Sequence, residues 1–138
     1  MARTNGKIAG GGFHHVCMRV KDLHTSIKFY TEGLGFVEKA SWRPDPTRCV
    51  LLDAGDGNYF EIAQGDPHKT QEAGLFQHIA LRTENCDAAT DAARTAGAEI
   101  TVEPKDVILP NDPPLQVRVS FCKGPDGEVI EFFQNNQT

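Results

Sequence analysis

Two histidines and two glutamates stand at matching places in the two halves of this 138-residue chain. His15 opens the run His-Val-Cys-Met-Arg-Val, and His78 holds the same place in His-Ile-Ala-Leu-Arg-Thr, 63 residues later. Glu61 and Glu131 lie in two further similar runs, at an offset of 70. Imidazole and carboxylate donors suit Zn²⁺, Ni²⁺, Co²⁺, Mn²⁺ or Fe²⁺. The four residues therefore predict one site for a divalent metal ion.

Each of the four residues, taken alone, could also have a purely structural role. A single histidine in a strand is more often a surface or hydrogen-bonded core residue than a metal ligand. A single glutamate usually marks the solvated face of an antiparallel sheet. The duplication favours the metal site, because four such residues recur in equivalent places of two otherwise different halves.

Strand alternation predicts what surrounds the four residues. Every second residue of a strand points to the same face, so the neighbours at i±2 and i±4 share a cavity with the proposed ligands. This places a small set of side chains beside the metal as predicted substrate contacts: Arg19, Arg82, Tyr59 and Phe133. The arginines would attract an anion and the aromatic rings would form apolar walls. The same alternation points His14 to the opposite face, as a structural residue.

The elements that must hold these residues repeat in order. Apolar residues alternate over 13–20, and then recur at helical spacing from Leu23, with Asp22 as the N-cap, until Gly33 and Gly35. Three further strands follow at 36–43, 48–53 and 59–63. The second half repeats the pattern, with a strand at 75–82, a helix ending at 96, and strands at 98–103, 115–122 and 128–133. The predicted fold class is α+β, with two βαβββ modules forming curled mixed sheets around a metal-binding cup.

We predict a flexible N-terminal arm over residues 1–12, because this segment is rich in glycine and lacks periodicity. Residues 13–134 form a single domain, made of a module over 13–64 and a module over 75–134. The segment 65–74 between them contains Pro67 and little hydrophobic content, so we expect a linker.

Composition excludes several classes of protein. The formal net charge is −5 and the basic residues form no run, which argues against a nucleic-acid partner. No apolar stretch is long enough to span a membrane and no signal peptide is evident, so we expect a cytoplasmic protein. The four cysteines form no CxxC pair and predict neither a thiolate zinc site nor disulfides.

The chain resembles the vicinal oxygen chelate superfamily over about residues 13–134. The resemblance rests on four motifs: His-Val-Cys-Met-Arg-Val-Lys-Asp-Leu from His15, Ser-Ile-Lys-Phe-Tyr-Thr-Glu-Gly-Leu-Gly-Phe from Ser26, Gln-His-Ile-Ala-Leu from Gln77, and Gly-Pro-Asp-Gly-Glu-Val-Ile-Glu-Phe from Gly124. This group includes glyoxalase I, methylmalonyl-CoA epimerase, extradiol dioxygenases and the bleomycin resistance proteins. Its metal positions match His15, Glu61, His78 and Glu131, and the complete set of two histidines and two glutamates is most similar to that of glyoxalase I.

The resemblance implies a glyoxalase I-like lyase or isomerase with one divalent metal ion, Ni²⁺ or Zn²⁺ being favoured. The substrate would be a small carbonyl compound or a thiohemiacetal, which is the adduct of a thiol and an aldehyde. Glu131 or Glu61 would transfer a proton by way of a metal-bound enediolate. Arg19 matches an arginine that helps to bind the glutathione carboxylates, whereas Gly65 stands where that family has an asparagine, which argues against glutathione.

Two alternatives stay open. One is another enzyme of the same fold, either an acyl-CoA epimerase or an Fe²⁺ extradiol dioxygenase. The other is a metal-free resistance protein that binds a drug or a metabolite. We also expect a homodimer, in which the metal cup forms either within one chain or between two chains.

Overall fold

The computed structural model describes residues 4–33, 35–65, 76–124, 127 and 129–138. The chain begins with strand β1 (Gly10–Val20), helix α1 (Leu23–Lys28), a π-helical segment η1 (Phe29–Gly33) and strands β2 (Val37–Trp42), β3 (Cys49–Gly55) and β4 (Asn58–Gln64). It continues with β5 (Phe76–Thr83), α2 (Cys86–Thr95), β6 (Glu99–Leu109), β7 (Leu115–Lys123) and β8 (Val129–Gln134). The linker predicted at 65–74 lies, apart from residue 65, outside the described residues.

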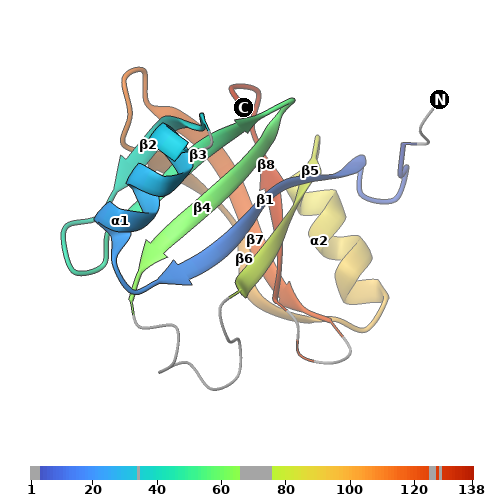
Figure 1. Cartoon of the computed structure of the whole chain (residues 1–138). Helices are drawn as coiled ribbons and strands as arrows, with labels where there is room; N and C mark the ends of the chain where they lie inside the picture. The colour runs from blue at the N-terminus through green and yellow to red at the C-terminus, as the bar shows by residue number, and fades with distance from the viewer. Residues whose placement is uncertain (1–3, 34, 66–75, 125–126, 128) are drawn as a thin grey trace.

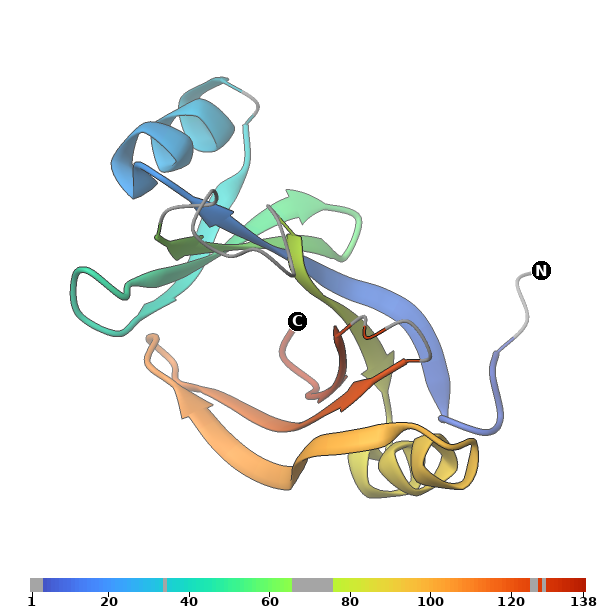
Figure 2. The same ribbon diagram turned by 90° about the horizontal axis from the view of Figure 1, so that it is seen from below.

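The eight strands form one mixed sheet in the order β2-β3-β4-β1-β5-β8-β7-β6. Within each half, the first and last strands run parallel, β1 beside β4 and β5 beside β8. The two halves join through the antiparallel pair of β1 and β5. Figure 1 shows the two halves of the sheet, and Figure 2 shows that they curl around a common concave side. The predicted α+β fold of two βαβββ modules is confirmed.

The first helix covers the outer side of the first half. Asp22 caps it by accepting a hydrogen bond from the Thr25 amide at 2.9 Å, as predicted. The α-helix ends at Lys28, earlier than the sequence predicted, and continues as the π-helical turn η1. This wider turn carries Tyr30, whose ring stacks on those of Phe36 and Phe60 at 5.3 and 5.7 Å. The aromatic stack fixes the helix on β4.

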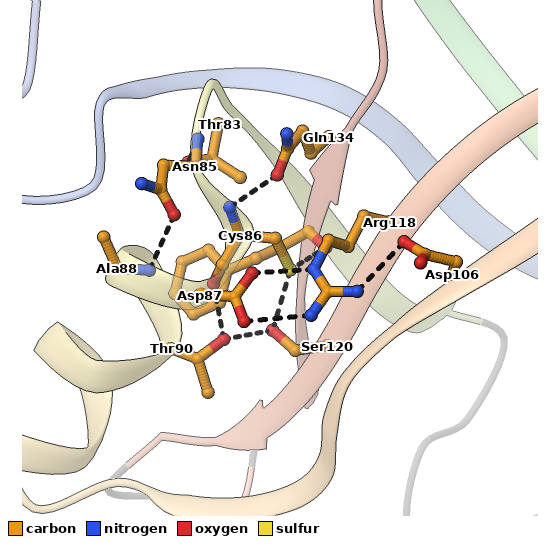
Figure 3. A network of polar contacts seen from close by, with 11 residues as sticks. Thr83, Asn85, Cys86, Asp87, Ala88, Thr90, Asp106, Arg118, Ser120 and Gln134 are labelled. Carbon is orange, nitrogen blue, oxygen red and sulfur yellow. Dashed lines mark hydrogen bonds and ion pairs between the residues drawn. The ribbon is translucent and has the colours of Figure 1, made fainter.

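The second helix is held by a network of polar contacts, drawn in Figure 3. Asn85 caps α2 through the Ala88 amide at 2.9 Å, and the Cys86 amide donates to the side chain of Gln134 at 2.8 Å. The hydroxyls of Thr90 and Ser120 lie 2.7 Å apart in a buried contact. These contacts tie α2 to β7 and to the end of β8, the strand that carries Glu131.

The N-terminal segment is attached to the sheet along part of its length. Strand β1 begins at Gly10, three residues before the predicted start. The Glu84 amide donates to the Ala9 carbonyl at 2.8 Å, and the Thr83 hydroxyl donates to the Ile8 carbonyl. The boundary of the predicted flexible arm was therefore wrong for residues 10–12, because backbone pairing offsets the entropy cost of the glycines.

The concave side of the sheet is lined by one hydrophobic cluster drawn from both halves. Its buried members are Ala40, Leu51, Tyr59, Ala80, Leu115, Val117, Val119 and Phe133. These side chains surround the space into which the proposed ligands point. Among the described residues, no helix is long and apolar enough to cross a membrane.

Candidate metal centre

His14 and His15 both face the concave side because strand β1 departs from regular alternation at His14. Phe13 pairs with Leu81 and His15 pairs with Ala80, so one extra residue, His14, is inserted in β1. Such a bulge turns two successive side chains towards the same side. His14 and His15 are both buried, with 1% and 2% of their surface exposed, whereas Phe13 is 65% exposed. The prediction that His14 faces away from His15 was wrong.

The four predicted ligands meet in one cluster supplied by a single chain. The Nε2 atoms of His15 and His78 lie 2.9 Å apart. The Oε2 atom of Glu131 lies 2.9 Å from His15 Nε2 and 3.1 Å from His78 Nε2. The Oε2 atom of Glu61 lies 3.1 Å from His15 Nε2 and 3.9 Å from His78 Nε2. All four donor atoms fall within 4.8 Å of one another.

This spacing fits a metal ion better than it fits a hydrogen-bonded network. Donors at about 2.0–2.2 Å from one ion are separated from each other by roughly 3–4 Å. The Glu131 Oε2 atom is buried and receives no hydrogen bond of acceptable geometry, although both imidazoles lie within 3.1 Å. A buried carboxylate oxygen without a partner is unfavourable. One ion between the four donors would satisfy this oxygen and both nitrogens.

In the metal-free cluster, the two carboxylates favour the protonated form of His15. Burial lowers the pKa of His15, but contacts with Glu131 and Glu61 outweigh it and raise this pKa to about 9. Burial raises the pKa of Glu131, but its contacts with His15 and His78 bring it well below its usual range. A divalent cation would take the place of the proton as the positive charge that these carboxylates need.

His14 lies directly behind His15. The Nδ1 atoms of the two imidazoles are 2.8 Å apart, and His14 Nε2 lies 2.5 Å from the Thr138 hydroxyl. Burial, together with the charges of His15 and Arg82, lowers the pKa of His14 to about 3. Thr138 belongs to the segment after β8, which turns back towards the concave side (Figure 2). Strand alternation gave no signal for either contact.

The two predicted arginines lie at different ends of the site. Arg19 contacts the side-chain amide of Gln77, whose oxygen accepts from the guanidinium once the amide is oriented to satisfy both ends. Arg19 also crosses Gly65, where a Cβ atom would come within 2.7 Å of Nη1. Glycine at position 65 therefore leaves the space that the Arg19 side chain occupies.

Arg82 is engaged with the backbone. Its nitrogens donate to the carbonyl oxygens of Phe13, Gly57 and Thr138. Its guanidinium lies 5.8 Å from the centre of the Tyr59 ring, within the range of a cation–π contact. Arg82 was predicted as a substrate contact, but its guanidinium is hydrogen-bonded to the protein backbone. Tyr59 and Phe133 do line the concave side, since both belong to its buried cluster.

Comparison with known proteins identifies the family. Residues 12–132 match the family model of the Glyoxalase/Bleomycin resistance protein/Dioxygenase superfamily. The chain belongs to this superfamily. Most of the chain, including all four residues of the cluster, lies within the match.

Several known proteins are similar to this chain over nearly their whole length. A Vibrio parahaemolyticus protein named "Probable lactoylglutathione lyase" is 31% identical over 97% of this chain and 94% of its own. Lactoylglutathione lyase of Haemophilus influenzae is 29% identical over 90% of this chain and 93% of its own. The uncharacterised protein YwbC of Bacillus subtilis is 32% identical over 87% of this chain and 94% of its own.

Solved structures of two other proteins share the fold. Methylmalonyl-CoA epimerase from Mycobacterium tuberculosis aligns with a TM-score of 0.73 at 21% identity, covering 97% of this chain and 93% of that one. The 2,3-dioxygenase LapB from Pseudomonas sp. KL28 aligns with a TM-score of 0.70 at 16% identity, covering 90% of this chain and 42% of that one. At these identities the likeness concerns the fold alone.

Proposed function

We propose that this protein is a metal-dependent lyase or isomerase of the glyoxalase I type, acting on a thiohemiacetal or a similar small carbonyl substrate. The observation that carries the proposal is the cluster of two histidines and two glutamates within 4.8 Å of one another in one chain. Relatives named lactoylglutathione lyase, at about 30% identity over nearly the whole chain, support the same activity.

A divalent ion held by His15, His78, Glu61 and Glu131 would act as a Lewis acid on the substrate carbonyl. Ni²⁺ and Zn²⁺ suit the nitrogen and oxygen donors, and Co²⁺, Mn²⁺ or Fe²⁺ would also fit. Two of the four donors are neutral imidazoles and two are carboxylates. The carboxylates together balance the charge of a divalent ion.

The two glutamates differ in how tightly they are held. Glu131 Oε2 lies within 3.1 Å of both imidazoles and its side chain is 7% exposed. Glu61 Oε2 approaches only His15 closely, lies 3.9 Å from His78, and its side chain is 16% exposed. We therefore assign the anchoring of the ion to Glu131. Glu61 is less tightly held and more accessible. It removes the proton from one substrate carbon and transfers it to the adjacent carbon.

The surrounding side chains bind and orient the substrate. Tyr59 and Phe133 form apolar walls that exclude water from the reacting carbon, which strengthens electrostatic interactions there. Arg19, held by Gln77, is the proposed contact for an anionic group on the substrate. Arg82 positions the wall through its contact with Tyr59.

The experiment must compare several thiols as the thiol component of the substrate, because Arg19 occupies the space beside Gly65. The test is to load the protein with Ni²⁺ or Zn²⁺ and follow deuterium uptake from solvent during turnover. The substrates are thiohemiacetals made from one 2-oxoaldehyde and either glutathione, coenzyme A or a small alkyl thiol. We expect isomerisation with at least one thiol.

Metal-loaded protein that turns over none of these adducts would contradict the proposal. Deuterium exchange on an acyl-CoA ester would indicate the epimerase alternative, and oxygen consumption with a catechol would indicate the dioxygenase alternative. Protein that takes up no ion but binds a drug or metabolite would indicate the metal-free resistance protein. The homodimer and the cytoplasmic location remain predictions.

A further inference from the structure

We propose that His14 is a positioning residue for the metal centre, and that it fixes His15 in the tautomer that presents Nε2 to the ion. The inference rests on the proposed role of His15 as a metal ligand. It assigns a task to a residue that regular strand alternation would have placed outside the site.

The hydrogen-bond partners allow only one useful assignment of protons. His15 Nε2 points into the cluster, 2.9 Å from His78 Nε2, and a ligand nitrogen must be unprotonated. His15 therefore carries its proton on Nδ1, which lies 2.8 Å from His14 Nδ1. His14 Nδ1 must accept this bond, so the proton of neutral His14 resides on Nε2.

The remaining members of the chain agree with this direction. His14 Nε2–H donates to the Thr138 hydroxyl at 2.5 Å, and that hydroxyl donates to the Asn135 side-chain oxygen at 2.9 Å. His14 and the Thr138 hydroxyl each donate one hydrogen bond and accept one. The series runs from the cluster to the segment after β8 without a conflicting donor or acceptor.

The His14 ring is also fixed in place by packing. It stacks on Phe133 with ring centres 4.0 Å apart and planes 28° apart, and on Tyr59 at 4.9 Å and 14°. Only 1% of the residue is exposed. A ring clamped between two aromatic residues cannot rotate away from His15, so its Nδ1 atom offers an acceptor at a constant position.

The bulge in β1 makes this arrangement possible. It brings His14 to the same side as His15, where a regular strand would direct it to the opposite face. Hydrogen-bond partners behind a metal-ligating histidine fix its tautomer and ring orientation, and their loss costs about 10–100-fold in metal affinity or activity. His14 fills this place with an imidazole, where a carboxylate or a backbone carbonyl is the more usual partner.

Two substitutions separate the hydrogen bond from the packing. His14→Phe keeps a ring between Tyr59 and Phe133 but removes the acceptor. His14→Asn removes the ring but can place an amide oxygen near the position of Nδ1. His24→Phe, on the exposed face of α1, is the matched control. Thr138→Val keeps the side-chain volume and removes the far anchor.

The first measurement is the affinity of each metal-free protein for Zn²⁺ by calorimetry, after thermal unfolding has shown that the variant folds. We expect affinity to fall about 10–100-fold in His14→Phe, and to be largely restored in His14→Asn. The control should match the wild type. His14→Phe with wild-type affinity would overturn the inference.

The second measurement is independent of turnover and of the His14 variants. Nitrogen-15 NMR of histidine-labelled protein, with and without Zn²⁺, should show a proton on His14 Nε2 and none on its Nδ1, together with a proton on His15 Nδ1. We expect Thr138→Val to blur this preference for His14. A His14 with its proton on Nδ1 would overturn the inference, whether or not the protein binds Zn²⁺. Wild-type protein that binds no ion would contradict the proposed function, and the NMR spectrum would still decide the role of His14.

Discussion

The Nε2 atoms of His15 and His78 lie 2.9 Å apart, although 63 residues separate the two histidines in the chain. They meet because β1 and β5, the first strands of the two modules, are antiparallel neighbours at the centre of the sheet. The last strand of each module, β4 or β8, lies parallel to its own first strand and carries a glutamate. The duplicated module thus brings two histidines and two glutamates to one place in the shared sheet.

Glu61→Gln tests the division of labour between the two glutamates. Because Glu61 is the looser carboxylate, we expect kcat to fall roughly 10²–10⁴-fold, the usual contribution of a general base, while the ion is retained. Glu131→Gln should instead lower the metal content. Steady-state kinetics and metal analysis of both variants distinguish these results. A Glu61→Gln enzyme with near wild-type kcat would show that Glu61 is not the base.

Metal binding should depend on pH through His15. Its pKa is raised to about 9 in the metal-free protein, so near pH 7 it must release a proton before it can bind an ion. We expect the apparent affinity to rise with pH up to about 9. Calorimetry in buffers with different ionisation enthalpies counts the released protons, and should find about one proton per ion. Metal uptake without proton release would contradict this account of the cluster.

The same pKa shift has the opposite effect on the metal-free fold. A histidine whose folded pKa is raised adds stability that is fully present below its unfolded pKa of about 6.5 and is lost as pH rises towards 9. The metal-free protein should therefore lose stability over the range in which its affinity for the ion increases. Denaturant unfolding at several pH values, with a chelator present, checks this sign.

Asn85→Ala tests how the second module is held together. The Asn85 side chain accepts from the Ala88 amide at 2.9 Å and caps α2. Loss of an N-cap typically lowers the free energy of unfolding by ~1 kcal/mol. The neighbouring exposed Glu84→Ala is a suitable control, since the substitution keeps the Glu84 backbone amide that bonds to Ala9. Urea unfolding should show the loss in Asn85→Ala alone; equal losses in both variants would count against the cap.

The cysteines should be unreactive in the folded protein. All four are buried and reduced. Burial and the charge of Glu61 raise the pKa of the Cys17 thiol, and burial likewise raises the pKa of Cys49 and Cys86. Because the thiolate is the reactive form, a thiol reagent at pH 8 should label the protein slowly before unfolding and at four sites afterwards. Rapid labelling of a cysteine in the folded state would contradict the burial described here.

Much of the fold could be predicted from the sequence because the signals were local. Alternating apolar residues, the cap Asp22, and the repeated His and Glu positions each follow from spacing along one strand or helix. The duplication then supplied the long-range information, since equivalent residues of two modules that share a sheet lie close together. For the same reason the four ligands were predicted together and the structure brings them together.

The parts that could not be predicted depend on departures from regular geometry. The bulge at His14 reverses the direction of one side chain, and no residue pattern in Phe13-His14-His15 distinguishes it from a regular strand. The contacts of Arg82 with three backbone carbonyls depend on where β1, the turn between β3 and β4, and the segment after β8 lie relative to one another. The early start of β1 is decided by pairing with residues more than 70 positions away, such as Thr83, the partner of Gly10.

The central claim is that His15, Glu61, His78 and Glu131 of one chain hold one divalent ion. The most direct measurement is the metal content of protein loaded with Ni²⁺ or Zn²⁺ and freed of excess ion, for the wild type and for His78→Gln. We predict one ion per wild-type chain and a content well below one in the variant. Wild-type protein that retains no ion, or a variant that retains as much as the wild type, would contradict the claim.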